Sequence, residues 1–153
     1  MQALELKIPP PVQWLFFAVL TGLAAWALPQ CNIPFAGHRL LALALAAAGV
    51  VSGVAGVLAF RQARTTIDPH RPQLARALVV HGVYRRTRNP MYLGLALVLA
   101  GVGCWWATPW VVLTLALFCL GITRLQIVPE ERILQAAFGA DYAAYRQRVR
   151  RWL

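Results

Sequence analysis

The sequence predicts an all-α, polytopic integral membrane protein with about four transmembrane helices. Of its 153 residues, 59% are hydrophobic and only 13% are charged, whereas soluble domains average about 45–50% and about 25%. The apolar residues also form long uncharged runs, each close to the roughly 17–25 residues with which a helix crosses a bilayer. This pattern excludes a disordered chain and disfavours an ordinary soluble domain.

Three long uncharged stretches give four expected spans, at residues 12–28, 40–60, 91–107 and 109–127, and the last of these includes Arg124 near its end. Pro11 and Pro29 bracket the first span, and proline cannot continue a helix. The third and fourth spans come from one uncharged stretch, 91–123, that is too long for a single crossing. We expect the turn just before Pro109, because proline begins a helix well and ends one badly. Residues 1–153 then form a single membrane domain.

The positive charge is expected to lie on one side of this bundle. Lys and Arg number 15 against 5 Asp and Glu, which gives a net charge of +10. Arginines crowd the connection between the second and third spans and the region after the fourth span, while the connection at 29–39 has only Arg39. The positive-inside rule makes both arginine-rich segments and both termini cytoplasmic, and we expect a bacterial inner (plasma) membrane. The charge therefore indicates anionic lipid rather than nucleic acid.

Side chains that can carry chemistry are concentrated in two cytoplasmic segments, 65–94 and 124–153. Each segment adjoins a span and is too short to be a domain, so we expect short cytoplasmic helices that together form a pocket. The three cysteines are widely separated and none belongs to a CxxC pair, so we expect neither a disulfide framework nor a metal site.

Two of the five acidic residues, Glu130 and Glu131, directly follow a proline. One interpretation is a helix start, where the helix dipole favours acids. The other is a cation-binding site, because carboxylates at a membrane boundary are costly and often functional. After Gly139 we expect a basic amphipathic helix that carries Tyr142 and Tyr145 and lies on the membrane.

Tyrosines and arginines frame the entry into the third span. Tyr84 and Tyr92 offer ring faces to a cation and hydroxyls to a polar group, although an interfacial anchor is an equal interpretation of Tyr92. The neighbouring arginines are suited to lipid phosphate, or to a ligand carboxylate through charge-assisted hydrogen bonds.

The order of these motifs resembles the isoprenylcysteine carboxyl methyltransferase and phospholipid methyltransferase superfamily. The resemblance covers about residues 65–153 and is carried by GVYRRTRNPMYLG at 82–94, a hydrophobic helical hairpin, and PEERILQAAFGADYAAYRQRVRRWL at 129–153. It implies an integral-membrane, S-adenosylmethionine-dependent methyltransferase of the bacterial type. The implied acceptor is lipid-borne or hydrophobic, either isoprenylcysteine carboxylate-like or phospholipid amine-like.

The resemblance also implies a set of cofactor-binding residues. Glu130 matches the family's cofactor-binding glutamate and Tyr84 its tyrosine. Asn89 stands where the family often has histidine, and Gln126 lies nearest to an arginine that the family associates with prenylcysteine substrate. The full expected set is Arg76, Ala77, Leu78, Val79, Tyr84, Arg88, Asn89, Pro90, Tyr92, Glu130 and Glu131.

The residue types suit S-adenosylmethionine on chemical grounds as well. A carboxylate fits its ammonium, tyrosine faces fit its sulfonium, arginine fits its carboxylate, and apolar Leu78 and Val79 fit its adenine. Methyl transfer has no obligate general acid, so positioning can supply much of the acceleration and no catalytic residue is assigned. The alternative is a non-catalytic four-helix membrane protein that binds anionic lipid or a partner through its basic cytoplasmic face.

Glycines on the second and third spans suggest a route for an apolar acceptor. Gly53, Gly56, Gly94 and Gly101 leave little bulk between these helices, and we expect a lateral opening near Tyr92. The competing interpretation is that these glycines let the helices pack closely.

Overall fold

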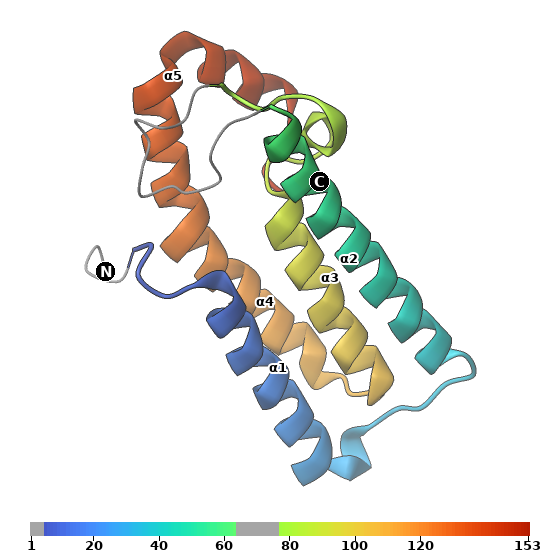
Figure 1. Ribbon diagram of the computed structural model, residues 1–153. Coiled ribbons are helices and arrows are strands. Elements are labelled where there is room, and N and C mark those ends of the chain that lie inside the picture. Colours follow the sequence, from blue (N-terminus) through green and yellow to red (C-terminus); the bar gives the residue numbers. More distant parts are fainter. Residues whose placement is uncertain (1–4, 64–76) are drawn as a thin grey trace.

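The computed structural model describes residues 5–63 and 77–153, and these residues form helices and no strand. Four apolar helices lie side by side, and the fourth continues upward into a longer helix (Figure 1). The helices are α1 (Pro10–Ala27), α2 (His38–Gln62), α3 (Pro90–Trp105), α4 (Trp110–Ile122) and α5 (Val128–Arg148), with short turns η2 (Pro29–Cys31), η4 (Gly82–Arg85) and η5 (Thr123–Ile127). The expected all-α fold is confirmed, and α4 together with η5 ends where the fourth span was expected to end.

The outer surfaces of the helices identify an integral membrane protein. Three helical stretches are long and apolar enough to cross a bilayer: Pro10–Ala27, His38–Gln62 and Trp110–Arg148. The fourth apolar helix, α3, has 16 residues and packs against all three neighbours. Large apolar side chains face outward, with Leu40 and Val112 each 73% exposed. Such surfaces are unfavourable in water and favourable in lipid.

The core of the bundle lies where α1, α3 and α4 meet. Tyr92, Leu99, Phe118 and Ile122 form its centre, and the last three are fully buried. A buried hydroxyl pair also joins α1 to α4, since Thr21 Oγ1 lies 2.7 Å from Thr114 Oγ1. Polar groups inside a membrane bundle need such partners, so this contact fixes the register of the two helices.

The glycines of α2 and α3 allow close packing, so the expected opening does not pass between these two helices at Gly94 or Gly101. A Cβ atom added to Gly94 would lie 2.5 Å from the carbonyl oxygen of Gly49, and one added to Gly101 would lie 2.9 Å from that of Ala42. The two backbones therefore touch, and no lipid chain can pass there. Gly53 is different, because a Cβ atom there would meet nothing within 4 Å.

Glu130 and Glu131 lie in the first turn of α5, after Pro129, but this helix continues from α4 and η5 without a break. Ile127 and Val128 both have helical backbone angles, and the chain is helical from Trp110 to Arg148. Pro129 has no N–H to donate. The turn before it therefore widens into a π-helical turn, η5, where a chain can lose one ordinary helical bond without ending the helix. The two carboxylates lie on the side of a continuous helix.

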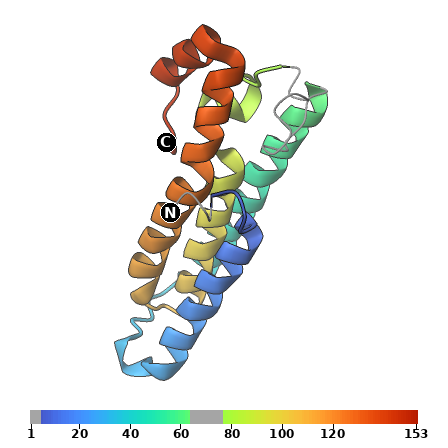
Figure 2. The same cartoon turned by 90° about the vertical axis from the view of Figure 1, so that its left-hand side faces the viewer.

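Beyond Gly139, α5 bends over the end of the bundle (Figures 1 and 2). Gly139 has φ 49° and ψ −118°, a conformation that favours glycine, and the expected break there is confirmed. Tyr142 and Tyr145 are 2% and 4% exposed. The tyrosine face of this helix therefore packs on protein rather than on the membrane. After Arg148 the chain turns back beside α5 (Figure 2).

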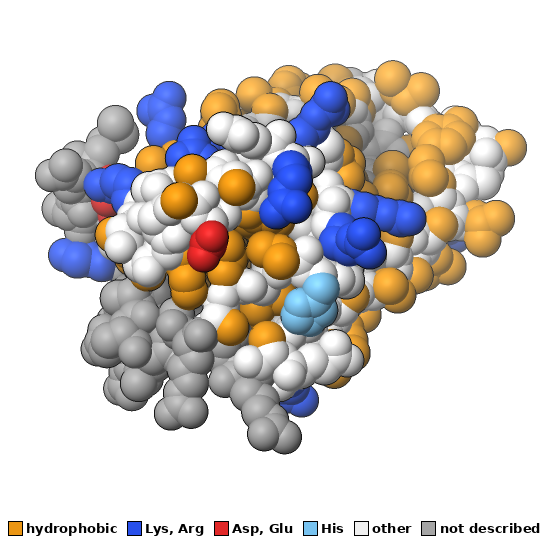
Figure 3. Space-filling view, turned by 90° about the horizontal axis from the view of Figure 1, so that it is seen from above, with side chains coloured by type: hydrophobic (Ala, Val, Ile, Leu, Met, Phe, Trp, Pro, Cys, Tyr) orange, Lys and Arg blue, Asp and Glu red, His pale blue; other side chains and the backbone are white. Residues whose placement is uncertain are grey.

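Positive charge gathers on this end of the molecule. Seen from above, Lys and Arg side chains surround the near end, and hydrophobic side chains cover the receding flank (Figure 3). The described arginines at this end belong to the end of α2, the approach to α3, η5, and α5 with its tail. By the charge rule this end faces the cytoplasm, and that orientation stays a prediction.

Candidate functional site

A cavity of about 930 Å³ lies at the arginine-rich end and extends down between the helices. Pockets of roughly 300–1,000 Å³ hold cofactor-sized ligands. Pro90 is buried but does not line the cavity, and its carbonyl oxygen accepts a 2.8 Å hydrogen bond from Ser52 Oγ. Arg76 lies outside the described residues. The other expected site residues all line the cavity: Ala77, Leu78, Val79, Tyr84, Arg88, Asn89, Tyr92, Glu130 and Glu131.

Glu130 receives a short hydrogen bond from the Tyr92 hydroxyl across the cavity. Tyr92 comes from the first turn of α3 and Glu130 from the first turn of α5. Burial raises the pKa of the Glu130 carboxyl to about 7; the Tyr92 hydrogen bond opposes the rise, and the charge of Glu131 adds to it. A cationic ligand group beside Glu130 would favour the ionised form.

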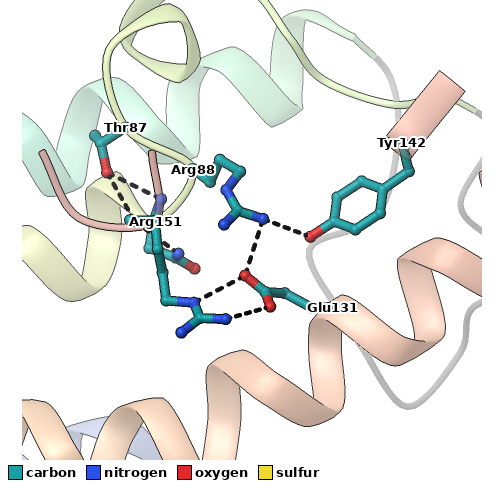
Figure 4. A network of polar contacts seen from close by, with 6 residues as sticks. Thr87, Arg88, Glu131, Tyr142 and Arg151 are labelled. Carbon is teal, nitrogen blue, oxygen red and sulfur yellow. Dashed lines mark hydrogen bonds and ion pairs between the residues drawn. The ribbon is translucent and has the colours of Figure 1, made fainter. Parts of the chain in front are cut away.

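Glu131 is held by two arginines (Figure 4). Arg151 donates from Nε to Oε1 at 3.0 Å and from Nη2 to Oε2 at 2.7 Å, and Arg88 Nη1 lies 2.9 Å from Oε1. Burial alone would raise the pKa of the Glu131 carboxyl, but the Arg151 hydrogen bonds and the charges of Arg88 and Arg151 together lower it. Glu131 is therefore ionised at neutral pH, and both of its oxygens already have partners.

Arg88 connects this ion pair to the cavity wall. Its Nη1 is shared between Glu131, at 2.9 Å, and the Tyr142 hydroxyl, at 3.3 Å (Figure 4). The side chain is only 10% exposed, yet its Nε is buried and has no hydrogen-bond partner among the residues that the structure describes. Native structures rarely leave a buried N–H unpaired, because its desolvation is costly. The Arg88 guanidinium can therefore donate a further hydrogen bond to a ligand in this cofactor-sized cavity.

The C-terminal tail closes this network from behind. Asn89 Nδ2 donates to the Arg151 carbonyl oxygen at 2.9 Å, and Thr87 Oγ1 donates to the same oxygen at 3.3 Å. The Arg88 backbone N–H donates to the Arg150 carbonyl at 3.1 Å. Asn89 thus uses its side-chain amide to hold the tail.

Two further tyrosines belong to the site, and the sequence did not assign them to it. Tyr142 and Tyr145 both line the cavity, and Tyr145 donates from its hydroxyl to the Tyr84 carbonyl oxygen at 2.8 Å. The Tyr84 ring meets Phe60 edge to face, with ring centroids 5.4 Å apart. Burial raises the pKa of Tyr84 and of Tyr145, so both rings stay neutral. The available signal was that Phe138, Tyr142 and Tyr145 follow helical spacing.

The other half of the cavity is apolar and reaches membrane depth. Leu95 and Val98 of α3 line it, together with Gly53, Val50 and Val54 of α2. Val98 stands eight residues after Pro90, which is roughly 12 Å along a helix. Val50 and Val54 are 58% and 51% exposed and also line the cavity. The cavity therefore opens on the lipid-facing flank of α2.

Residues 5–63 and 77–153 contain no cluster of three or more His, Cys, Asp or Glu that could hold a metal ion.

Known proteins identify the family of this chain but supply no structural template. An uncharacterized protein of Haemophilus influenzae is 41% identical over 63 residues, which are 41% of this chain and all of that protein. No solved structure matches the chain. The family model "Phospholipid methyltransferase" matches residues 38–141, well over half of the 153 residues. The chain therefore belongs to the phospholipid methyltransferase family, which supports a membrane methyltransferase in general.

Proposed function

We propose that this protein is an S-adenosylmethionine-dependent methyltransferase that acts on a lipid-borne or hydrophobic acceptor. The observation that carries the proposal is the continuity of the cavity. Its polar end brings together Tyr84, Arg88 and Glu130, and its apolar end lies at membrane depth beside Leu95 and Val98. A polar cofactor and an apolar acceptor can thus meet in one space, each reached from the phase that dissolves it.

The polar end of the cavity offers a partner for each charged group of S-adenosylmethionine. The buried Nε of Arg88 has no partner within residues 5–63 and 77–153, and such a donor suits a ligand carboxylate. Among the described residues, Tyr92 is the hydrogen-bond partner of Glu130, so this carboxylate can also accept an ammonium. Leu78 and Val79 offer an apolar wall to adenine, and Tyr84 and Tyr92 offer ring faces to a sulfonium. When bound, the cofactor supplies an electrophilic methyl group.

The protein's own residues then contribute binding, orientation and exclusion of water. Glu130, held by Tyr92, orients the ammonium side of the ligand, and Arg88, held by Glu131 and Tyr142, orients the carboxylate side. We propose that Glu131, Asn89, Pro90 and Arg151 act as positioning residues. Orientation of two reactants can supply up to about 7–11 kcal/mol of a reaction barrier. The acceptor group remains a carboxylate, an amine or a thiol.

Two measurements test the proposal. Detergent-purified protein is titrated calorimetrically with S-adenosylhomocysteine, and we expect one site per chain. The protein in lipid nanodiscs is then incubated with methyl-labelled S-adenosylmethionine and a total membrane lipid extract, and the labelled product is identified by mass spectrometry. Absence of binding, with retention of anionic vesicles by the basic face, would favour the non-catalytic alternative.

A further inference from the structure

Residues 5–9, called here the N-terminal strap, are fastened to the helix that carries Glu130. The Leu6 N–H donates to the Leu125 carbonyl oxygen at 2.9 Å. The Gln126 side-chain amide donates to the Ile8 carbonyl oxygen at 2.7 Å. An ion pair between Glu5 and Arg132 adds a third tie. The strap is therefore held against η5 and α5 rather than by α1 alone.

The Ile8 carbonyl is the most firmly held point of the strap. Gln13 Nε2 also donates to it, at 3.0 Å, so two side-chain amides converge on one oxygen. Gln126 is 3% exposed and Gln13 is 8% exposed. Leu6, just before this point, has a φ of 59°, which is uncommon for a residue other than glycine. Such a backbone persists only where the surrounding contacts determine it.

The strap also forms part of the cavity wall. Leu6 and Pro9 line the cavity, and so do Pro10 and Pro11 at the start of α1. The flank of α2 that borders the same cavity is exposed to lipid. Because α1 packs on α3 and α4 whereas α2 packs on α3, the strap lies on the α1 side of this opening.

We propose that the strap bounds the compartment for the acceptor's hydrocarbon chain, and that Gln126 and Gln13 are positioning residues that limit how a chain enters it. The proposal rests on the proposed function. Its occupant is the acceptor's chain, because the compartment is apolar, opens toward the bilayer, and continues into the polar end where Glu130 lies. Gln126 lies in η5, the turn that leads into α5, so the strap is bonded to the helix that carries Glu130.

Photolabelling from the bilayer tests this assignment without requiring the natural acceptor. The protein is placed in nanodiscs that contain a phosphatidylethanolamine with a diazirine at the end of one acyl chain, and no cofactor is added. Labelling of Leu95 and Val98, inside the cavity, is divided by labelling of Leu113 and Leu117, which face lipid on α4. The variants are Gln126→Met, which keeps the volume but not the donor, Leu6→Trp, and the control Gln147→Ala on the exposed face of α5.

We expect Gln126→Met to raise the labelling ratio about fivefold. Loss of one ordinary hydrogen bond changes the equilibrium between the fastened and the released strap by about this factor. Leu6→Trp should lower the ratio by filling the compartment, and Gln147→Ala should leave it unchanged. S-adenosylhomocysteine affinity should stay near the wild-type value in all three. A ratio that is unchanged in both strap variants, or raised equally by Gln147→Ala, would overturn the inference. Failure of the wild type to bind S-adenosylhomocysteine would contradict the proposed function instead, because the labelling does not depend on cofactor.

Discussion

Arg151 forms a two-pronged ion pair with Glu131, at 3.0 and 2.7 Å, although twenty positions separate them along the chain. The pair fastens the tail after α5 to the first turn of that helix. Arg88 contacts the same carboxylate through Nη1, and its Nε has no partner in the described part of the chain. Through Glu131, the tail therefore helps to position the guanidinium of Arg88, a residue far from it along the chain.

Replacing Arg151 by alanine should destabilise the protein and weaken cofactor binding together. Glu131 would lose two hydrogen bonds and keep only Arg88. Because the Arg151 side chain is 35% exposed, we expect a loss of only about 1–2 kcal/mol. Thermal unfolding in detergent measures the stability. Arg148→Ala, at an exposed position near the end of α5, is the matched control, and equal unfolding temperatures for the two variants would refute the role.

The two adjacent carboxylates should differ in their effect on S-adenosylhomocysteine affinity. Glu130→Gln removes the proposed ammonium partner, and a hydrogen bond to a charged group contributes about 1.5–3 kcal/mol. We therefore expect a loss of roughly tenfold or more in calorimetric affinity. Glu131→Gln should have a smaller effect on affinity and a larger one on unfolding temperature. Near-wild-type affinity in Glu130→Gln would exclude this residue from the site.

Cofactor affinity should depend on pH through Glu130. Its pKa is raised to about 7, so the carboxylate that attracts an ammonium is mostly protonated at pH 6 and mostly ionised at pH 8. Affinity should therefore rise with pH, by about tenfold between these values. Tyr92→Phe removes a hydrogen bond that lowers this pKa, and should move the midpoint upward. A profile that keeps its slope in Glu130→Gln would assign the titration to another group.

Gly94 should tolerate no side chain, whereas Gly53 should tolerate alanine. A Cβ atom at Gly94 would lie 2.5 Å from a backbone oxygen, and one at Gly53 would meet nothing within 4 Å. Overpacking of this kind typically costs about 1–3 kcal/mol. We expect Gly94→Ala to lower the unfolding temperature and Gly53→Ala to leave it unchanged. If the two variants unfold alike, the close contact between α2 and α3 is not as described.

The orientation in the membrane can be read with reporter fusions. Fusions after residues 34 and 108 should report the external side, and fusions after residues 70 and 153 the internal side, because arginines gather at the second pair of positions. An external signal after residue 70 would contradict the topology.

The helices could be predicted from the sequence because the uncharged runs are long and hydrogen bonds within a membrane helix are local. The pairing of Tyr92 with Glu130, and of Arg151 with Glu131, could not, because these contacts depend on how segments far apart fold together. Pro129 lies at the start of α5, as proline often does, but only the structure reveals the wider turn through which the helix continues from α4. Gly94 was ambiguous for a related reason. Sequence alone does not say whether a small residue faces a neighbouring backbone or open lipid.

The uninterrupted helix from Trp110 to Arg148 connects the mechanics of the bilayer to the proposed site. A membrane helix tilts when the hydrocarbon core of the bilayer becomes thinner than its apolar stretch is long. Since no loop separates α4 from α5, such a tilt moves Glu130 and Glu131 relative to Tyr92 and Arg88 on the approach to α3. The strap moves with them, because it is bonded to Leu125 and Gln126 in the same helix. We therefore expect lipid composition to change the geometry of both halves of the cavity.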